Sequence, residues 1–498
     1  MPLTLDGAVL DPPAPRAAPR ARPPASALVA ELGAVLEATG IRYCQWKGLA
    51  GRDRWAAGLG DLDLLIDRSS AVVFARVLAG LGFREAVAPP GLEVPGVLSY
   101  LAPDPALGRL IHVHAHFQLV VGRPWARHTR LPIEAAVLAS AVRGMPFRVP
   151  APEFALLLLV VRSTLQHDVR DLVRRGDPPW LRTTRAELAH VRHGVGRAAL
   201  LETIERHVPE MDRACLDACL ATLEPGAPAW RRVATRMLLE RRLTAHARRP
   251  PATVAVRRVA RAAARALGAR PARGGKHLAT GGAVIALVGP DGSGKSTCAR
   301  ALESWLTPEL DVEHAHMGRP PRTAVTLAIG AAVKLARRLA AVLPHRGRRV
   351  RDGHLTLLRC VCTARDRFLL HRRLRRRAAA GAIVICERYP IPENRALVGP
   401  SYAQGVATDA SGPLATLLRR LESRYYARLS PPDLVLALRV DPETAVLRKP
   451  GEPEPYVRAR ARILWNTEWS SDHVELVDAG EPLPAVVATL RARIWEAL

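Results

Sequence analysis

The sequence has few lysines and few aromatic residues, and both scarcities bear on what the protein binds. Lysine occurs only at positions 47, 276, 295, 334 and 449, so the formal net charge of +27 comes mostly from arginines scattered through every segment. Aromatic residues make up only 4% of the chain. The basic runs therefore lack the interleaved rings on which nucleic-acid bases stack. Although positive charge attracts phosphates, we do not expect nucleic acid to be the main partner.

A disulfide framework and long apolar runs are also missing. Seven cysteines spread over 498 residues do not form the even, closely spaced set of a disulfide-stapled domain. The nearest candidates for a membrane span, 154–161 and 324–333, are shorter than the roughly 18 residues that a bilayer requires. Residues 1–24 lack the apolar core of a signal peptide and are predicted to be disordered. We therefore expect a cytoplasmic protein in a reducing compartment, without a membrane span.

The length and the apolar fraction of 48% predict two or three domains with packed cores. A first α/β domain is predicted over 25–150, with helices at 25–39 and 71–81 and strands at 62–66 and 110–121. The pattern then becomes helical over 151–248, which we interpret as an extension of this domain. Residues 249–282 are rich in Pro, Gly and Arg and predict a basic linker with one helix at 255–267.

The remaining segment, 283–498, alternates short apolar runs with helical stretches. Strands are expected at 283–288, 312–316, 382–386, 434–440 and 473–477, and helices at 295–306, 324–342, 355–379, 413–429 and 483–498. Strands that alternate with helices imply crossover connections between parallel strands. The predicted fold class is therefore α/β, with a doubly wound parallel sheet in this last domain.

A glycine-rich segment, Gly289-Pro-Asp-Gly-Ser-Gly-Lys-Ser-Thr297, lies between the expected strand 283–288 and the expected helix 295–306. This spacing and context are typical of a P-loop, whose backbone N–H groups converge on phosphates at a helix N-terminus. Lys295 is expected to reach the β- and γ-phosphates and to act in catalysis, and Ser296 to bind magnesium. The predicted cofactors are ATP and Mg2+, and the predicted binding residues are Gly289, Asp291, Gly292, Ser293, Gly294, Lys295, Ser296 and Thr297.

Four segments of 283–498 together resemble thymidylate kinases. They are the P-loop with its internal Asp291, Ala364-Arg-Asp-Arg367, Glu387-Arg-Tyr389, and Pro432-Asp-Leu-Val-Leu-Ala-Leu-Arg-Val-Asp441. The resemblance implies a thymidylate-kinase-like P-loop domain in which Asp291, Arg367 and Arg388 face the acceptor.

The resemblance also implies catalytic roles near the transferred phosphate. Arg388 would clamp a phosphate at the carboxyl end of a parallel strand. Glu387 would hold a magnesium-bound water or orient Arg388, at a position where the family usually has Asp. A mobile lid would supply arginines, and the candidates are Arg448, Arg458, Arg460 and Arg462.

The acceptor is left open, because residues 317–351 form a longer insertion beside the acceptor site than compact thymidylate kinases need. The first hypothesis is ATP-dependent phosphoryl transfer to a nucleoside monophosphate or a related phosphorylated or sugar small molecule. The second is an ATP-binding regulatory or assembly protein without kinase turnover, and the third is nucleic-acid binding through the basic segment 249–273. The oligomeric state is open, with a homodimer as one candidate.

The first domain carries Trp46-Lys-Gly-Leu49 and, further on, Asp61-Leu-Asp-Leu64, which resembles the nucleotidyltransferase pattern. Alternation places Asp61 and Asp63 on one face of a strand, where they could hold Mg2+. Leu49 and His112 differ from the residues that the family prefers, so the site is either active or a remnant. His112, His114 and His116 also share one strand face. Two interpretations of these histidines are open: they form a metal site, or they are side chains on a half-exposed strand without a metal.

Overall fold

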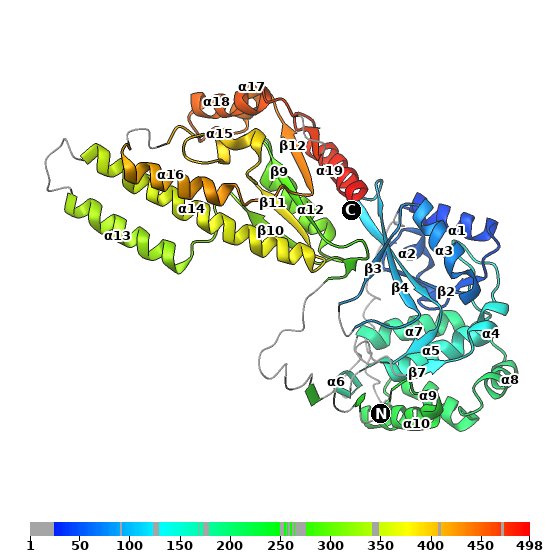
Figure 1. The fold of residues 1–498 in the computed structure, drawn as a ribbon. Coiled ribbons are helices and arrows are strands. Elements are labelled where there is room, and N and C mark those ends of the chain that lie inside the picture. The colour runs from blue at the N-terminus through cyan, green and yellow to red at the C-terminus, as the bar shows by residue number, and fades with distance from the viewer. Residues whose placement is uncertain are drawn as a thin grey trace, which may run out of the picture.

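The structure is a computed structural model of the chain. It describes residues 24–89, 92–122, 129–167, 169–172, 179–249, 275–340, 348–406, 410–469 and 473–498, and a few residues between 253 and 263. The predicted disordered segment 1–24, except for its last residue, and most of the predicted helix 255–267 lie outside these residues. Two α/β units, each built on its own sheet, make up the described part (Figure 1).

The first unit has a six-stranded sheet in the order β1-β2-β5-β4-β3-β8. Strands β2 and β5 are parallel to each other, and the other neighbouring strands are antiparallel. The bounds are β1 (Tyr43–Gln45), β2 (Asp61–Ile66), β3 (Arg84–Val87), β4 (Val97–Asp104), β5 (Arg109–His116) and β8 (His277–Leu278), and a separate ribbon is formed by β6 (Leu119–Val121) and β7 (Thr129–Leu131).

Short helices complete the first unit. Helix α1 begins at Ala27 because the hydroxyl of Ser26 accepts a hydrogen bond from the N–H of Val29 and so caps the first turn. The helical segments before residue 150 are α1 (Ala27–Ala38), η1 (Leu49–Gly51), α2 (Arg52–Ala56), η2 (Arg68–Ser70), α3 (Ala71–Gly80) and α4 (Glu134–Ala139).

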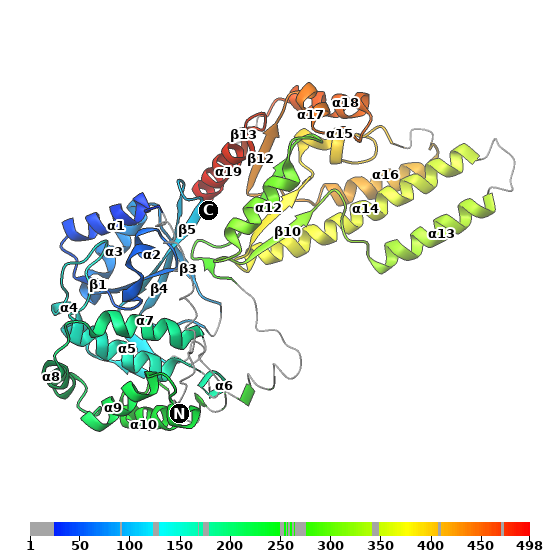
Figure 2. The same cartoon turned by 180° about the vertical axis from the view of Figure 1, so that it is seen from behind.

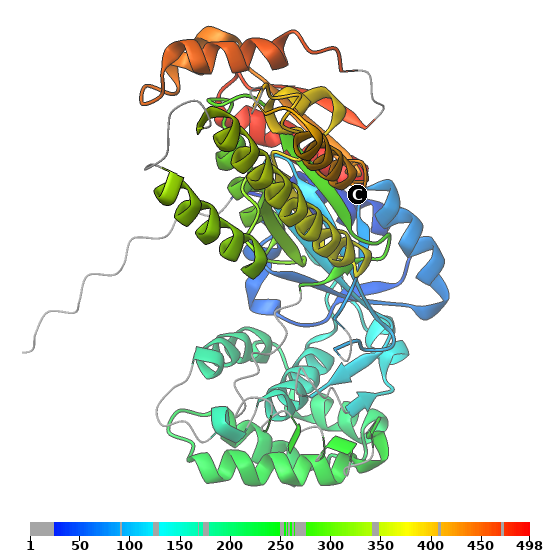
Figure 3. The ribbon, with the colours of Figure 1, turned by 60° about the vertical axis from the view of Figure 1, so that its left-hand side comes forward.

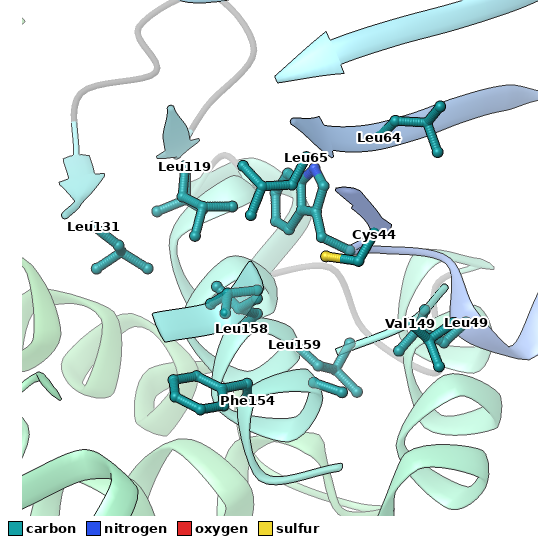
Figure 4. Close-up of a cluster of buried hydrophobic side chains, with 14 of the residues drawn as sticks. Cys44, Leu49, Leu64, Leu65, Leu119, Leu131, Val149, Phe154, Leu158 and Leu159 are labelled. Atoms are coloured by element: carbon teal, nitrogen blue, oxygen red, sulfur yellow. The ribbon is translucent and has the colours of Figure 1, made fainter. Parts of the chain in front are cut away.

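The predicted helical extension is present and packs into the same core as the first sheet. Helix α5 is apolar on nearly all sides, which is typical of a helix at the centre of a domain. Figure 4 shows Phe154, Leu158 and Leu159 of α5 near Leu65 of β2 and Leu119 of β6. The bounds are α5 (Pro152–Gln166), α6 (Val169–Leu172), α7 (Pro179–Arg192), α8 (Arg197–His207), α9 (Arg213–Leu223), α10 (Ala229–Arg242) and η3 (Leu243–His246).

The second unit is a five-stranded parallel sheet in the order β10-β11-β9-β12-β13. Its strands are β9 (Ala283–Val288), β10 (Val312–His316), β11 (Ile383–Glu387), β12 (Leu434–Arg439) and β13 (Val474–Asp478). Its helical segments are α12 (Lys295–Leu306), α13 (Ala324–Ala340), α14 (Arg348–Ala379), η5 (Pro392–Asn394), α15 (Arg395–Val398), α16 (Pro413–Tyr426), α17 (Pro442–Leu447), α18 (Glu454–Trp465) and α19 (Leu483–Ala497).

Helices cover both faces of this sheet, as a doubly wound fold requires. In strand β9, Ile285 and Leu287 pack into a core with residues of α12 and α19. The alternating residues Val284 and Ala286 pack into a second core with residues of α14. Figure 2 shows α14 continuing well beyond the sheet. Figure 3 shows α13 and α16 beside α14.

One buried hydrophobic cluster spans the junction of the two units. Ala86 and Leu101 of the first sheet belong to the same buried cluster as Leu306 and Trp495 of the second unit. The predicted linker 249–282 is therefore not a linker to its end, because His277–Leu278 forms strand β8 at the edge of the first sheet. Gly275, just before β8, passes so close to the backbone of Leu310 that a Cβ would lie 2.1 Å from its carbonyl carbon.

Most predicted elements of the second unit are present within a few residues of their expected bounds, and β9, β10 and α12 have the expected bounds. One prediction for the first unit is wrong in detail: the segment 110–121 is two strands, because Phe117 and Gln118 interrupt it and β6 leaves the main sheet. No helix among the described residues combines the length and apolarity needed to traverse a bilayer.

Candidate functional site

The P-loop lies where the sequence places it, between the end of β9 and the start of α12. Gly292 and Gly294 have φ values of 88° and 80°, in the left-handed region that glycine adopts without strain. A Cβ on Gly292 would also lie 2.5 Å from the carbonyl oxygen of Ala445 in α17. Since the sequence supplies glycine at both positions, the loop can turn its backbone toward a ligand at the N-terminus of α12.

Lys295 is buried, with only 6% of the residue exposed. Its ammonium donates to the carbonyl oxygen of Pro290 at 2.5 Å and lies 3.4 Å from the hydroxyl of Ser293. Burial, with Arg388 nearby, lowers the pKa of Lys295 to about 8. An anionic ligand in the loop would offset both effects, because it would supply the negative charge that a buried ammonium lacks.

Ser296 and Glu387 bring a hydroxyl and a carboxylate together beside the loop. The Ser296 hydroxyl donates to Oε2 of Glu387 at 2.5 Å, and Nε2 of His314 lies 3.0 Å from Oε1 of the same carboxylate. Burial raises the pKa of Glu387, but the hydrogen bonds from His314 and Ser296 outweigh it and lower the pKa to about 2. Glu387 is therefore ionised at neutral pH. Two hard oxygen donors at the mouth of a P-loop fit Mg2+.

Asp291, inside the loop, holds two arginines that come from distant parts of the chain. Arg388, directly after β11, donates to Oδ1 of Asp291, and Nε of Arg460 in α18 lies 3.2 Å from Oδ2. Burial raises the pKa of Asp291, but Arg388, Lys295 and Arg460 outweigh this and leave it below its ordinary value. Arg388 has a φ of 54°, which is uncommon outside glycine.

These contacts separate the predicted lid arginines. Arg460 lies at the P-loop carboxylate. Arg458 pairs instead with Glu443 at 2.8 Å, and Arg448 donates to the carbonyl oxygen of Ala479 at 2.6 Å. Arg462 lies on the same helix, α18.

The structure places Arg367 differently from the other predicted acceptor residues. It is buried in α14, and its Nε donates to the carbonyl oxygen of Met317 at 2.8 Å. Its Nη1 lies 3.3 Å from the carbonyl oxygen of Val398 and also contacts the hydroxyl of Tyr426. These contacts connect the start of the 317–351 insertion to α14 and α15. The role of Arg367 in acceptor binding stays a prediction.

Asp61 and Asp63 lie on one face of β2, as predicted, and the three histidines of β5 face them. Nδ1 of His112 lies 2.8 Å from Oδ1 of Asp61, and Nε2 of His116 lies 3.2 Å from Oδ1 of Asp63. Lys47 contacts the same Asp63 oxygen at 2.8 Å. Burial raises the pKa of both carboxyls, but these partners outweigh it, lowering the pKa of Asp61 to about 2 and that of Asp63 well below its ordinary value. The magnesium site at Asp61 and Asp63 stays a prediction.

Sequence reasoning missed His314 as a site residue. Strand β10 pairs with β11 so that His316 lies beside Glu387 and His314 beside Ile385. The alternation His314-Ala-His316 within an expected strand was a visible signal. It could be used only once the neighbour of that strand was known.

No family model matches the chain. The Escherichia coli (strain K12) protein described as "Uncharacterized ATP-binding protein YghS" is 27% identical over 220 residues, which cover 42% of this chain and 91% of the relative. The protein described as "Uncharacterized ATP-binding protein YghR" from the same strain is 26% identical over 220 residues, covering 41% of this chain and 83% of the relative. A solved thymidylate kinase from Candida albicans is 20% identical and covers 43% of this chain and 92% of its own, with a TM-score of 0.28 that carries no argument about fold.

Proposed function

We propose that the protein is an ATP-dependent kinase that transfers a phosphoryl group to a nucleoside monophosphate or a related phosphorylated or sugar small molecule. The observation that carries the proposal is the arrangement around Asp291, where Arg388 and Arg460 converge on a P-loop that also holds the buried Lys295. Guanidinium and ammonium groups gathered at one loop are what a transferring phosphoryl group requires, because its negative charge spreads over three oxygens.

Each group has a distinct task in this proposal. Backbone N–H groups of the loop and Lys295 bind the phosphates of ATP, and Lys295 exchanges its bond to the Pro290 carbonyl for phosphate oxygens. Arg388 and Arg460 leave Asp291 for phosphate oxygens as substrates bind, which gives bidentate contacts that fix the geometry of transfer. Ser296 and Glu387 would hold Mg2+, which neutralises phosphate charge when it is bound.

The two relatives support ATP binding, since both are named as ATP-binding proteins. Their aligned length of 220 residues is close to that of segment 283–498. Neither name states an acceptor, so the acceptor class rests on the resemblance of the motifs and on the arginines at Asp291.

The alternative is an ATP-binding regulatory or assembly protein without turnover. The observation that favours it is Arg367, whose guanidinium is engaged with the Met317 and Val398 carbonyl oxygens and with Tyr426 rather than directed at the P-loop. In that case ATP would order the lid helix α18 for a partner, and no acceptor would be phosphorylated.

Purified protein with ATP and Mg2+, offered nucleoside monophosphates, sugars and sugar phosphates, separates the two functions by ADP release and product mass. The kinase proposal predicts turnover with one acceptor class. Lys295→Ala should reduce this turnover about 100-fold or more, because it removes several charge-assisted contacts to phosphate, each worth about 1.5–3 kcal/mol. The exposed Arg206 of α8, in the first unit, gives a control that also removes one positive charge, and Arg206→Ala should behave as wild type.

Tight ATP binding without any acceptor, together with a binding partner that is lost in Lys295→Ala, would support the regulatory alternative instead. Unchanged ATP affinity in Lys295→Ala would contradict both functions.

A further inference from the structure

A cluster of carboxylates and imidazoles lies in the first unit, apart from the P-loop. Strands β2 and β5 are parallel neighbours, and their register places Asp61 opposite His112 and Asp63 opposite His114. Because side chains alternate along a strand, all four project to the same face of the sheet. One ligand atom each from Asp61, His112 and His114 lies within 4.8 Å of the others.

We propose that Asp61, His112 and His114, completed by Glu309 of the second unit, form a binding site for one divalent transition-metal ion of the Zn2+ type. The proposal is independent of the kinase function proposed above. It differs from the predicted Mg2+ pair of Asp61 and Asp63 in both its ligands and its ion.

The distances between donor atoms lie on either side of the edge lengths of a coordination shell. Nδ1 of His112 lies 2.8 Å from Asp61 Oδ1 and 3.4 Å from Glu309 Oε2, and Nδ1 of His114 lies 3.6 Å from Asp61 Oδ2. An ion with bonds of about 2.0–2.2 Å has neighbouring ligands about 3.0–3.5 Å apart in octahedral or tetrahedral arrangement. The Asp61–His112 pair would open slightly and the Asp61–His114 pair would close slightly around an ion, and Glu309 would approach from the side of His112.

The choice of ion follows from the donor types. Imidazole nitrogen suits Zn2+ and its first-row neighbours, whereas Mg2+ prefers an all-oxygen shell and retains its waters. The second carboxylate that a magnesium pair would need, Asp63, has its Oδ1 engaged by three groups at once: Lys47 at 2.8 Å, His116 at 3.2 Å and His114 at 3.3 Å.

The carboxylates of Asp61 and Glu309 both lie near Nδ1 of His112. A cation at this point would offset the repulsion between the two carboxylates. Lys276 pairs with Oε2 of Glu309 at 2.7 Å in the structure, and its ammonium would move away from that oxygen when the ion binds.

The site opens onto a cavity of about 470 Å3 between the two units, which Asp61, His112, His114, Ser99, Lys276 and Glu309 help to line. Side chains of Asp61 and Glu309 are 44% and 23% exposed, so the ion would be reachable from this cavity. Metal sites with three or four protein ligands that face an open cavity keep positions for water or a ligand, unlike closed structural sites. The cavity is large enough for a small molecule bound to the ion.

The test uses the full chain without a histidine tag, stripped of metal. Calorimetric titration with Zn2+, and the visible spectrum with Co2+ as a probe of imidazole ligands, should show one equivalent bound. His114→Gln and Glu309→Gln should each weaken Zn2+ binding about tenfold or more. His193→Gln, on the exposed surface of the helical part, is the matched control and should bind as wild type. Excess Mg2+ should not displace the ion.

Circular dichroism and thermal melting establish that each variant is folded. The partly exposed Glu309 serves as the second variant if His114→Gln does not fold. Absence of a bound equivalent at micromolar Zn2+, binding that neither variant weakens, or displacement by millimolar Mg2+ would each overturn the proposal. ATP affinity measured on the same samples should be unchanged, which keeps a failure here distinct from a failure of the kinase proposal.

Discussion

The hydroxyl of Ser296 donates a hydrogen bond of 2.5 Å to Oε2 of Glu387, although the two residues are 91 positions apart. Ser296 lies in the first turn of α12 and Glu387 at the end of the neighbouring strand β11. In an open parallel sheet, ligands gather at the carboxyl ends of the strands, where crossover connections leave a crevice. The pair therefore lies where the phosphates and the metal of a bound nucleotide are expected.

The first prediction concerns this pair. Glu387→Gln keeps the shape of the side chain but removes its charge, so we expect the Mg2+ concentration for half-maximal activity to rise about tenfold or more, since an ionised donor binds a hard cation far better than an amide. Glu387→Asp, which keeps the charge, should retain most of the activity. Turnover measured against Mg2+ at saturating ATP checks both. Equal Mg2+ dependence in wild type and Glu387→Gln would contradict a metal role for this residue.

The second prediction compares two arginines of the same helix. Arg460→Ala should lower kcat about 100-fold, because removing one preorganised donor to a developing negative charge typically costs that much. Arg458→Ala should change kcat less than about threefold, because its pair with Glu443 lies on the surface, where such pairs contribute little. Steady-state kinetics with the acceptor from the screen decide the comparison. Similar losses in the two variants would show that α18 acts through its overall charge rather than through Arg460.

The fold of the second unit was largely predictable from the sequence. The arrangement of the candidate site was predictable only in part. Lys295 and Ser296 could be placed because local sequence determines a P-loop: the apolar strand, the glycines and the helix start are contiguous. Glu387 and Arg388 could be placed because they follow an apolar strand, and the ends of parallel strands meet at one edge.

The remaining contacts depend on which elements become neighbours, which local patterns do not encode. Choosing Arg460 over Arg458 requires knowing which face of α18 turns toward Asp291, and finding His314 requires the pairing of β10 with β11. Strand β8 was missed because two residues in a Gly- and Arg-rich segment are too few to show an alternation of apolar and polar side chains. The strand forms through its pairing with β3.

The third prediction is a pH dependence of stability. The hydrogen bond to Glu387 raises the pKa of His314 above its usual 6.5, although burial opposes it, and Glu387 itself has a pKa of about 2 against an ordinary 4.5. A raised histidine pKa contributes stability below pH 6.5 that is lost as pH rises through the folded-state value. A lowered carboxyl pKa contributes stability above pH 4.5 that is lost as pH falls toward 2. The pair therefore stabilises the fold most between pH 4.5 and 6.5.

His314→Asn should consequently lower the free energy of unfolding by about 1–3 kcal/mol near pH 5.5, the usual range for a hydrogen bond to a charged group. The loss should shrink at pH 8. Denaturant unfolding at several pH values measures it, with His193→Asn in the exposed turn after α7 as the control. A loss that does not vary between pH 5.5 and pH 8 would mean that His314 acts through packing and not through charge.

The fourth prediction tests whether the two units form one cooperative structure. Trp495 of α19 is buried, packs edge-on against Trp305 of α12 with ring centres 6.3 Å apart, and donates its indole N–H to the carbonyl oxygen of Gly82 in the first unit at 3.0 Å. Trp495→Ala should lower the free energy of unfolding by about 3–5 kcal/mol, as expected when a buried aromatic ring leaves a cavity. Trp230→Ala, at a site 67% exposed, should cost less than about 0.5 kcal/mol. Because Trp495 belongs to the buried cluster that also contains Ala86 and Leu101 of the first sheet, its loss should shift the unfolding of the first unit as well as the second, which hydrogen exchange can report for each separately. Protection lost only in the second unit would show that the junction through Gly82 does not couple the two.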